Sequence, residues 1–290
     1  MQTKSLQGKT VALTGASGGL GNAICKQILS NGGDLIVIDR NPKKQAALIE
    51  ELRAAYKESK IEGLLADMED MESVKALCAA LSARRIDHLI LNAGAYSIPR
   101  KKTALGLDNV FCINFVSPYY MARTLAPALT ARGGSVVAVG SIAHNYAKSD
   151  PSDEDFSTRT RASLVYGNAK RHLMAAFFAL AEKGERVSVT HPGIAFTGIT
   201  AHYPRLIFAL IRYPMKLIFM KPKKAALSIY EGLFTPTQSG EWIGPRLFNV
   251  WGKPKKQALK TIGADEKKRL AAYAEDLYQA ISDPNGKQTN

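Results

Sequence analysis

Short apolar runs alternate with amphipathic segments over the first 190 or so residues of the chain. Six of these runs are rich in Val, Ile and Leu and show little alternation of apolar and polar positions: 10–14, 35–39, 61–66, 88–92, 135–140 and 187–191. Such runs are typical of strands that are buried on both faces of a parallel sheet. A further run, 246–250, predicts a seventh strand.

Segments with helical periodicity separate the runs. The expected helices are 20–31, 42–59, 71–83, 104–131 and 163–183, with a terminal helix at 264–281. Strands that alternate with helices in this way predict an α/β fold, here one doubly wound, Rossmann-type parallel sheet of about seven strands with helices on both faces. We therefore expect a single domain, 1–290, rather than two smaller ones.

The composition adds one feature, which is an excess of positive charge. Hydrophobic residues make up 46% of the 290, enough for one large core, and the formal net charge is +14. Such a charge would favour binding to nucleic acid, to an anionic membrane surface or to acidic ligands. The basic residues are scattered and no aromatic stacking motif accompanies them, so we expect no specific nucleic-acid partner.

The cysteines bear on compartment and on metal binding. Cys25, Cys78 and Cys112 have no metal-ligand spacing, and we expect buried free thiols and no metal site. Free thiols are typical of a reducing, cytoplasmic compartment. No apolar signal-peptide core lies between Met1 and the strand at 10–14, which also favours a cytoplasmic location.

A glycine-rich turn closes the first strand and opens the first helix: residues 14–21 read TGASGGLG. Gly15 permits the tight turn, while Gly19 and Gly21 let the backbone approach a pyrophosphate and let the helix pack on the sheet. The helix amino terminus offers free N–H groups and partial positive charge to phosphate. In this strand–helix context the pattern predicts a dinucleotide site rather than a merely flexible turn.

Two neighbouring residues at the end of the second strand bear on the choice between NAD and NADP. Asp39 follows Gly21 by 18 residues, and a carboxylate there can accept both ribose hydroxyls of NAD and would repel the additional phosphate of NADP. Arg40 could instead clamp that phosphate. We expect NAD, with NADP as the alternative.

Three further residues supply a hydroxyl, a phenol and an ammonium. Tyr166 and Lys170 are four residues apart in an expected helix and so share one helix face. A free tyrosine is a sluggish base near neutral pH, and a nearby ammonium, together with the positive nicotinamide ring of an oxidised cofactor, would lower the pKa of the phenol. Ser141, directly after the strand at 135–140, would hydrogen-bond a substrate oxygen and stabilise its developing charge. The Tyr–Lys pair alone would fit an ordinary surface helix.

Together these motifs resemble the short-chain dehydrogenase/reductase family. The resemblance implies hydride transfer between a nicotinamide dinucleotide and an alcohol or ketone, with Tyr166 as acid/base, Lys170 as its tuner and Ser141 as oxygen stabiliser. It adds Asn114 as a residue that relays protons through water to the lysine. A long polar interval before Tyr166, from 144 to 161, and the His-Pro-Gly at 191–193 are similar to the branch of retinol dehydrogenases and hydroxysteroid dehydrogenase-like enzymes.

The resemblance also completes the expected cofactor site. Asp67 would hold the adenine edge, although an aspartate there could also cap a helix. The turn at 92–94 would lie beneath the ribose, and Thr197 would bond the nicotinamide carboxamide. The full cofactor-binding set is Gly15, Ser17, Gly19, Leu20, Gly21, Asp39, Arg40, Asp67, Met68, Asn92, Ala93, Gly94, Tyr166, Lys170, Pro192, Gly193, Ile194 and Thr197.

The regular alternation stops after Thr197. Residues 203–220 read YPRLIFALIRYPMKLIFM, and the resemblance makes this region, about 198–224, a lid over the substrate. A lid this apolar implies a bulky hydrophobic substrate such as a steroid or retinoid. A core or dimer helix and an interfacial helix in peripheral membrane contact are the alternatives, but Pro214 and the interspersed charges break a clean amphipathic face.

Two other classes of protein would fit the same fold, charge and apolar segment. A dinucleotide-binding regulator with vestigial catalysis would keep the fold, although all four catalytic residue types are present here. A membrane-surface scaffold would use the positive charge and the apolar lid. The family resemblance also implies a homodimer or homotetramer, assembled through the helices at 104–131 and 163–183.

Overall fold

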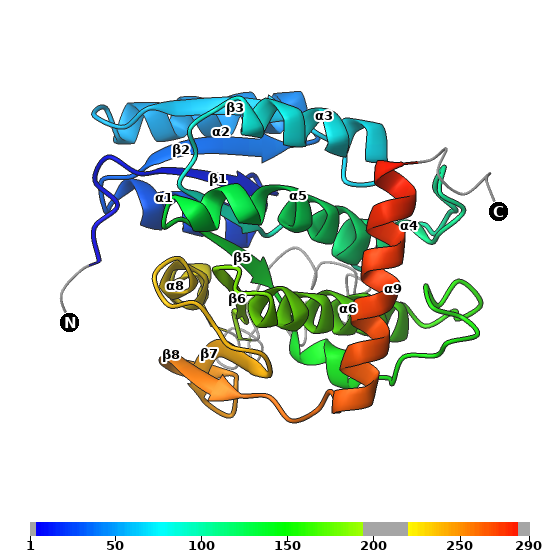
Figure 1. Cartoon of the computed structure of the whole chain (residues 1–290). Coiled ribbons are helices and arrows are strands. Elements are labelled where there is room, and N and C mark those ends of the chain that lie inside the picture. The colour runs from blue at the N-terminus through cyan, green and yellow to red at the C-terminus, as the bar shows by residue number, and fades with distance from the viewer. Residues whose placement is uncertain (1–3, 194–219, 284–290) are drawn as a thin grey trace, which may run out of the picture.

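Eight strands form one sheet in the computed structural model, which describes residues 4–193 and 220–283 (Figure 1). Their order in the sheet is β3-β2-β1-β4-β5-β6-β7-β8, and neighbouring strands are parallel except β7 and β8, which are antiparallel. The strands are β1 (Thr10–Thr14), β2 (Asp34–Asp39), β3 (Ile61–Leu65), β4 (His88–Leu91), β5 (Ser135–Val139), β6 (Val187–Thr190), β7 (Glu241–Leu247) and β8 (Trp251–Ala258).

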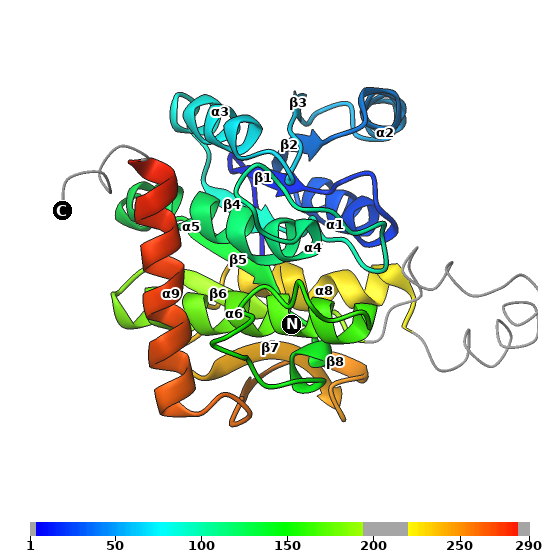
Figure 2. The same ribbon diagram turned by 90° about the vertical axis from the view of Figure 1, so that its right-hand side faces the viewer.

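Helices cover both faces of the sheet, so the predicted doubly wound α/β fold is confirmed (Figures 1 and 2). One face carries α1 (Gly19–Leu29), α2 (Pro42–Ala55) and α8 (Pro222–Gly232). The other face carries α3 (Met71–Ser82), α4 (Asn109–Phe111), the π-helix η1 (Cys112–Val116), α5 (Ser117–Ala131), α6 (Ala162–Glu182) and α9 (Ala264–Ser282). A short 3₁₀ helix, η2 (Ile142–Asn145), follows β5.

Two hydrophobic clusters hold these layers together. Successive side chains of a strand point to opposite faces of a sheet. Val11 and Leu13 therefore pack with α1 and α2, whereas Ala12, between them, packs with the cluster of α3, α5 and α6. Because both faces are buried, the central positions of β1 and β2 are apolar, which explains why their runs were visible in the sequence. The three cysteines lie in these clusters as buried free thiols, as expected.

The expected strand at 246–250 is wrong. Strand β7 ends at Leu247, and the apolar residues after it form an exposed turn in which Phe248 and Asn249 have φ of 52° and 57°. The strand itself contains Gly244 and Pro245, which interrupt its apolar pattern. Strand β8 was not predicted, because an exposed edge strand with three lysines has no apolar run.

The expected helix at 104–131 begins later, at Asn109. Asp108 accepts hydrogen bonds from the backbone N–H groups of Val110 (2.9 Å) and Phe111 (3.2 Å), which fixes the start of α4. The residues before it turn back on themselves through a bridge between Lys102 and Asp108. The terminal helix is confirmed at 264–282, and α8, which begins within the expected lid region, was not predicted.

Ile194, Thr197 and residues 198–219 of the expected lid lie outside the described residues. Among the residues that are described, no helix has the length and apolar character needed to cross a membrane.

Candidate active site

The predicted site residues follow the strands at one edge of the sheet. The carboxyl ends of parallel strands share an edge, and this is where ligands bind in doubly wound sheets. Residues at or just after the strand ends include Gly15 (β1), Asp39 (β2), Asp67 (β3), Asn92 (β4), Ser141 (β5) and Pro192 (β6).

The glycine turn has the geometry of a phosphate site. Gly15 has φ of +67°, and a Cβ there would lie 2.9 Å from the Cα of Ala93. A Cβ on Gly21 would lie 2.2 Å from the carbonyl oxygen of Gly15, so the first turn of the helix packs directly on the glycine turn and leaves no space for a side chain here. Gly19 has open space where a Cβ would be. Helix α1 has neither a side-chain cap nor an acidic residue in its first turn, so its N–H groups can serve an anion.

Thr14 and Asn92 hold this turn against β4. The Thr14 hydroxyl accepts hydrogen bonds from the N–H groups of Asn92 and Ala93, both at 3.0 Å. The Asn92 side-chain amide donates back to the carbonyl oxygens of Thr14 (3.0 Å) and Gly15 (3.1 Å). The turn at 92–94 is therefore fixed beside the glycine turn, and Thr14 is a structural member of the site that was not predicted.

Asp39 lies where the ribose hydroxyls of a dinucleotide are expected. It is 7% exposed and accepts hydrogen bonds from the backbone N–H (3.0 Å) and the hydroxyl (2.9 Å) of Ser17. Burial raises the pKa of its carboxyl, and the two Ser17 bonds oppose that rise. Arg40 is exposed and pairs with Glu69 at 3.5 Å, and Glu69 also binds Lys101 at 2.7 Å.

Asp67 does not cap helix α3, which was the alternative role that the sequence allowed for it. Asp70 caps α3 through the N–H of Glu72, whereas the Asp67 carboxylate accepts a bond from the N–H of Glu69 (2.9 Å). Met68 is buried, and its carbonyl oxygen accepts a bond from Ser117 on α5 at 2.7 Å. Both residues lie beyond the end of β3, and their roles toward a cofactor stay predictions.

Ser141, Tyr166 and Lys170 come together beside the end of β5. The Ser141 hydroxyl faces the Tyr166 phenol as a hydrogen-bonding group that opposes the rise in its pKa. The Lys170 ammonium lies 5.7 Å from the centre of the Tyr166 ring and donates to the carbonyl oxygen of Val139 at 2.8 Å. Tyr96 packs edge-on against the Tyr166 ring, 5.4 Å between centres, which fixes the plane of the phenol.

Burial sets the pKa directions of this group. Burial raises the pKa of Tyr166 to about 12, and the bond from Ser141 only partly offsets this effect. Burial also lowers the pKa of Lys170 to about 7. The ammonium is itself desolvated here, so it does not hold the phenol at a low pKa by proximity alone. Tuning of the phenol therefore depends on further positive charge reaching the site.

Asn114 stands in the π-helix η1, between α4 and α5. Its side-chain amide donates to the carbonyl oxygens of Ala95 and Val110, both at 2.8 Å. The side-chain oxygen is buried and has no hydrogen-bond partner among the described residues. A Cβ on Gly94 would lie 2.8 Å from that oxygen. A π-turn commonly marks a functional position, and here it presents an acceptor next to the 92–94 turn.

His144 holds Ser141 in place and was not predicted. Its Nδ1–H donates to the carbonyl oxygen of Ser141 at 2.6 Å, and its Nε2 accepts from the Thr261 hydroxyl at 2.6 Å. The ring lies edge-on against Trp242. Trp242 also stacks on His191, with 4.9 Å between the ring centres. Burial lowers the pKa of His144 and His191, so both rings are neutral near pH 7. No sequence pattern distinguished His144 from the polar stretch that it begins.

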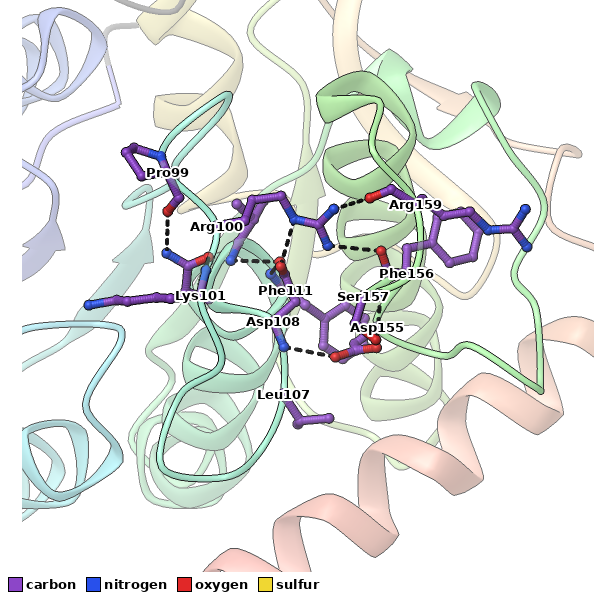
Figure 3. Close-up of polar contacts among 12 residues, drawn as sticks. Pro99, Arg100, Lys101, Leu107, Asp108, Phe111, Asp155, Phe156, Ser157 and Arg159 are labelled. Atoms are coloured by element: carbon purple, nitrogen blue, oxygen red, sulfur yellow. Dashed lines mark hydrogen bonds and ion pairs between the residues drawn. The ribbon is translucent and has the colours of Figure 1, made fainter.

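The polar stretch before Tyr166 is tied to the loop that follows β4 (Figure 3). The Arg100 guanidinium bonds the carboxylate of Asp108 (2.7 Å) and the carbonyl oxygens of Phe156 (2.9 Å) and Arg159. The Asp108 N–H donates to Asp155 at 2.8 Å. Phe156 is buried at φ of 54° and packs in a small cluster beside Tyr166. This stretch therefore supports the catalytic phenol.

A second set of bonds ties the same stretch to the C-terminal helix. Glu154 pairs with buried His172 on α6 (2.8 Å) and with Arg269 on α9. The Arg171 guanidinium on α6 donates to the Glu266 carboxylate at 2.7 Å. Burial alone would raise the pKa of Glu266, but the hydrogen bonds to its carboxylate lower this pKa to about 2. In the described part of the chain no cluster of His, Cys, Asp or Glu side chains could hold a metal ion.

The residues present fit a dinucleotide. The free amino terminus of α1, the open space at Gly19 and the Asp39 carboxylate lie near the ends of β1 and β2. The unpartnered oxygen of Asn114 lies beside Gly94. Pro192 and Gly193 follow β6. The geometry thus provides places for phosphate, ribose and a reacting ring beside Ser141 and Tyr166.

Comparisons with known proteins agree with this geometry. A family profile described as short chain dehydrogenase matches residues 9–150. Human retinol dehydrogenase 14 is 30% identical over 248 residues, 78% of this chain and 74% of that protein. Mouse retinol dehydrogenase 12 is 28% identical over 205 residues, which are 67% of this chain but only 64% of the relative. A crystal structure of an uncharacterized protein from Mycobacterium Paratuberculosis has a TM-score of 0.72 at 23% identity, with 95% of each chain covered.

Proposed function

The chain belongs to the short-chain dehydrogenase family, and we propose that it transfers hydride between a nicotinamide cofactor and the hydroxyl or ketone of a bulky hydrophobic substrate. The observation that carries this proposal is the placement of the Ser141 hydroxyl beside the Tyr166 phenol, with Lys170 one helical turn away, at the edge of the sheet that holds the glycine turn. The residue roles below follow from that arrangement.

The chain's own residues manage the proton. In ketone reduction the Tyr166 phenol donates its proton to the substrate oxygen, and the Ser141 hydroxyl stabilises the charge that develops there. A bound nicotinamide would supply the hydride, or accept it in the reverse direction. Lys170 then returns a proton to Tyr166, and Asn114 would help to pass a proton through water to Lys170. Because burial places the pKa of Lys170 at about 7, this amine can give and take a proton near neutral pH.

The test is nicotinamide absorbance with NADH or NADPH and a panel of steroid, retinoid and aliphatic ketones. We expect oxidation of NADH with a large apolar ketone and none with sugars. The apolar sequence of 203–220 supports a hydrophobic substrate, as do the names of the retinol dehydrogenase relatives. Tight dinucleotide binding without turnover on any ketone would favour a regulator instead.

Preference for NAD follows from Asp39. A carboxylate at this position repels a ribose phosphate, and it also holds the N–H and hydroxyl of Ser17 that could otherwise donate to that phosphate. Arg40, the competing cation, is paired with Glu69. We expect Asp39→Ala to raise the ratio of kcat/KM for NADPH over NADH by about tenfold or more, measured by initial rates with both cofactors.

Asp34→Ala is the matched control, since Asp34 lies at the other end of the same strand. It should leave the cofactor ratio unchanged. An Asp39→Ala enzyme that keeps the parent ratio would remove Asp39 as the selector, and a parent enzyme that uses only NADPH would assign the selection to Arg40.

His144 should affect the chemical step through Ser141. We expect His144→Phe, which keeps a ring beside Trp242 but loses both hydrogen bonds, to lower kcat by about tenfold with the KM for cofactor unchanged. His144→Gln, whose amide can still donate to the Ser141 carbonyl oxygen, should recover most of kcat. His88→Phe removes a buried histidine bond to Ser135 at the other edge of the sheet and should reduce stability without this loss of kcat.

A further inference from the structure

An exposed apolar tip stands at the turn between β7 and β8. Leu247, Phe248 and Trp251 are 53%, 87% and 40% exposed, and they are among the few large hydrophobic side chains on the described surface. Phe248 also adopts φ of 52°, a conformation that is costly for a bulky side chain. The fold thus directs a phenyl ring into solvent at a backbone position that few residue types favour. Clustered exposed apolar side chains of this kind mark interaction sites.

The strands that flank this tip are strongly basic. Between residues 242 and 264 the sequence has five basic residues and no acidic one. Four of the basic residues lie on the hairpin, namely Arg246, Lys253, Lys255 and Lys256, and all four are exposed. Lys256 pairs with Glu241 at the far end of β7, away from the tip. Apolar side chains at a tip with cations behind them match the layers of an anionic bilayer, in which acyl chains lie beneath negative headgroups.

The tip lies at the edge of the sheet that carries the active site. β7 is parallel to β6, so the turn that follows it lies with the other carboxyl ends. The Nε2–H of His191 donates to the carbonyl oxygen of Asn249 in this turn at 3.0 Å. A Cβ on Gly193 would lie 2.8 Å from the carbonyl oxygen of Val250. The turn is therefore joined directly to the loop that follows β6.

We propose that the β7–β8 tip docks this protein on an anionic lipid surface. Phe248 and Trp251 enter the interface, and the basic side chains of the hairpin lie against the headgroups. The strand ends that carry the catalytic residues then lie beside the membrane. This docking is independent of the identity of the substrate, and its tests below need no turnover.

The chain carries its own optical probe for the test. It has two tryptophans, of which Trp242 is buried and Trp251 lies at the tip. The intact protein is mixed with phosphatidylcholine vesicles that contain or lack phosphatidylserine. We expect co-sedimentation and a blue shift of tryptophan emission with the anionic vesicles only, both reversed by high salt because salt screens the cations. Trp251→Phe should remove the blue shift and keep the binding.

Variants at exposed positions separate the two halves of the surface. Phe248→Ser should weaken binding to anionic vesicles by about tenfold because it removes a ring that would be buried in the interface. Lys253→Glu with Lys255→Glu should weaken it by at least as much. The matched controls lie on or just before β3, the edge strand opposite β8. Leu65→Ser changes an apolar residue that is 53% exposed, as Leu247 is, and Lys57→Glu with Lys60→Glu reverses two exposed lysines. Neither control should alter binding.

Three outcomes would overturn the proposal. The first is an absence of vesicle binding at low salt. The second is binding that the controls reduce as much as the tip variants do, since the net charge of the whole protein would then explain it. The third is a Phe248→Ser variant that binds vesicles normally but changes the oligomeric state by light scattering, which would assign the tip to a second copy of the chain.

Discussion

Replacing Tyr166 with phenylalanine should lower kcat by about 10³-fold, within the range of 10²–10⁴ that a positioned acid or base contributes. The ring stays in its contacts with Tyr96 and the cluster around Phe156. Only the hydroxyl that faces Ser141 is lost, so the affinity for dinucleotide should change by less than about twofold. Steady-state rates and cofactor fluorescence titration measure the two quantities.

Tyr56→Phe provides the control for the loss of a phenol, because Tyr56 bonds Ser30 at the far end of α2. It should have parental kcat. A Tyr166→Phe enzyme with normal turnover would contradict the proposed mechanism. One that loses cofactor binding along with turnover would show that the phenol acts in binding rather than in proton transfer.

Gly21→Ala should destabilise the fold at the start of α1. The added Cβ would lie 2.2 Å from the carbonyl oxygen of Gly15 and 2.7 Å from that of Ala16, both of them backbone atoms in the same tight turn. Overpacking of this kind costs about 3 kcal/mol, which would lower Tm by about 6–12 °C in a protein of this size. Thermal unfolding followed by circular dichroism checks the expectation.

Gly19→Ala is the matched comparison, two residues earlier in the same helix. A Cβ at Gly19 meets no atom within 4 Å, so Tm should be kept or slightly raised. The methyl group would occupy space next to the N–H groups of the first turn, and we expect dinucleotide affinity to fall by about tenfold. Equal Tm losses in both variants would contradict the packing assigned to Gly21.

Burial on both faces decided which strands were visible in the sequence. The strands β1, β2, β4, β5 and β6 lie inside the sheet, and each has an apolar run that the sequence shows directly. β3 lies at an edge and is mostly exposed, and the sequence showed it only through the apolar residues at its ends. Strand β8 lies at the edge with Lys253, Lys255 and Lys256 exposed, so its strand conformation comes from pairing with β7 rather than from its own residues. Pairing of that kind is tertiary and leaves no periodic signal.

The site was predictable where spacing along one element sets it. The four-residue interval between Tyr166 and Lys170 places both on one face of α6, and the glycine spacing sets the turn before α1. The pKa directions and the support of Ser141 were not predictable, because burial and the contact of His144 with Thr261 join segments far apart in sequence. The π-helix around Asn114 was not predictable either, because its residues continue the helical pattern of the segment that follows them.

The position of α9 bears on how the chain can assemble. This helix lies across α5 and α6 (Figure 1), and its own Leu270 and Ala274 side chains are fully buried in the contact. Glu275 binds both Tyr119 (3.2 Å) and Arg123 (3.1 Å) on α5. A subunit that docked on the parts of α5 and α6 under α9 would have to displace α9 and break these contacts. The chain thus covers in cis part of the surface through which a dimer is expected, and an interface on these helices stays a prediction.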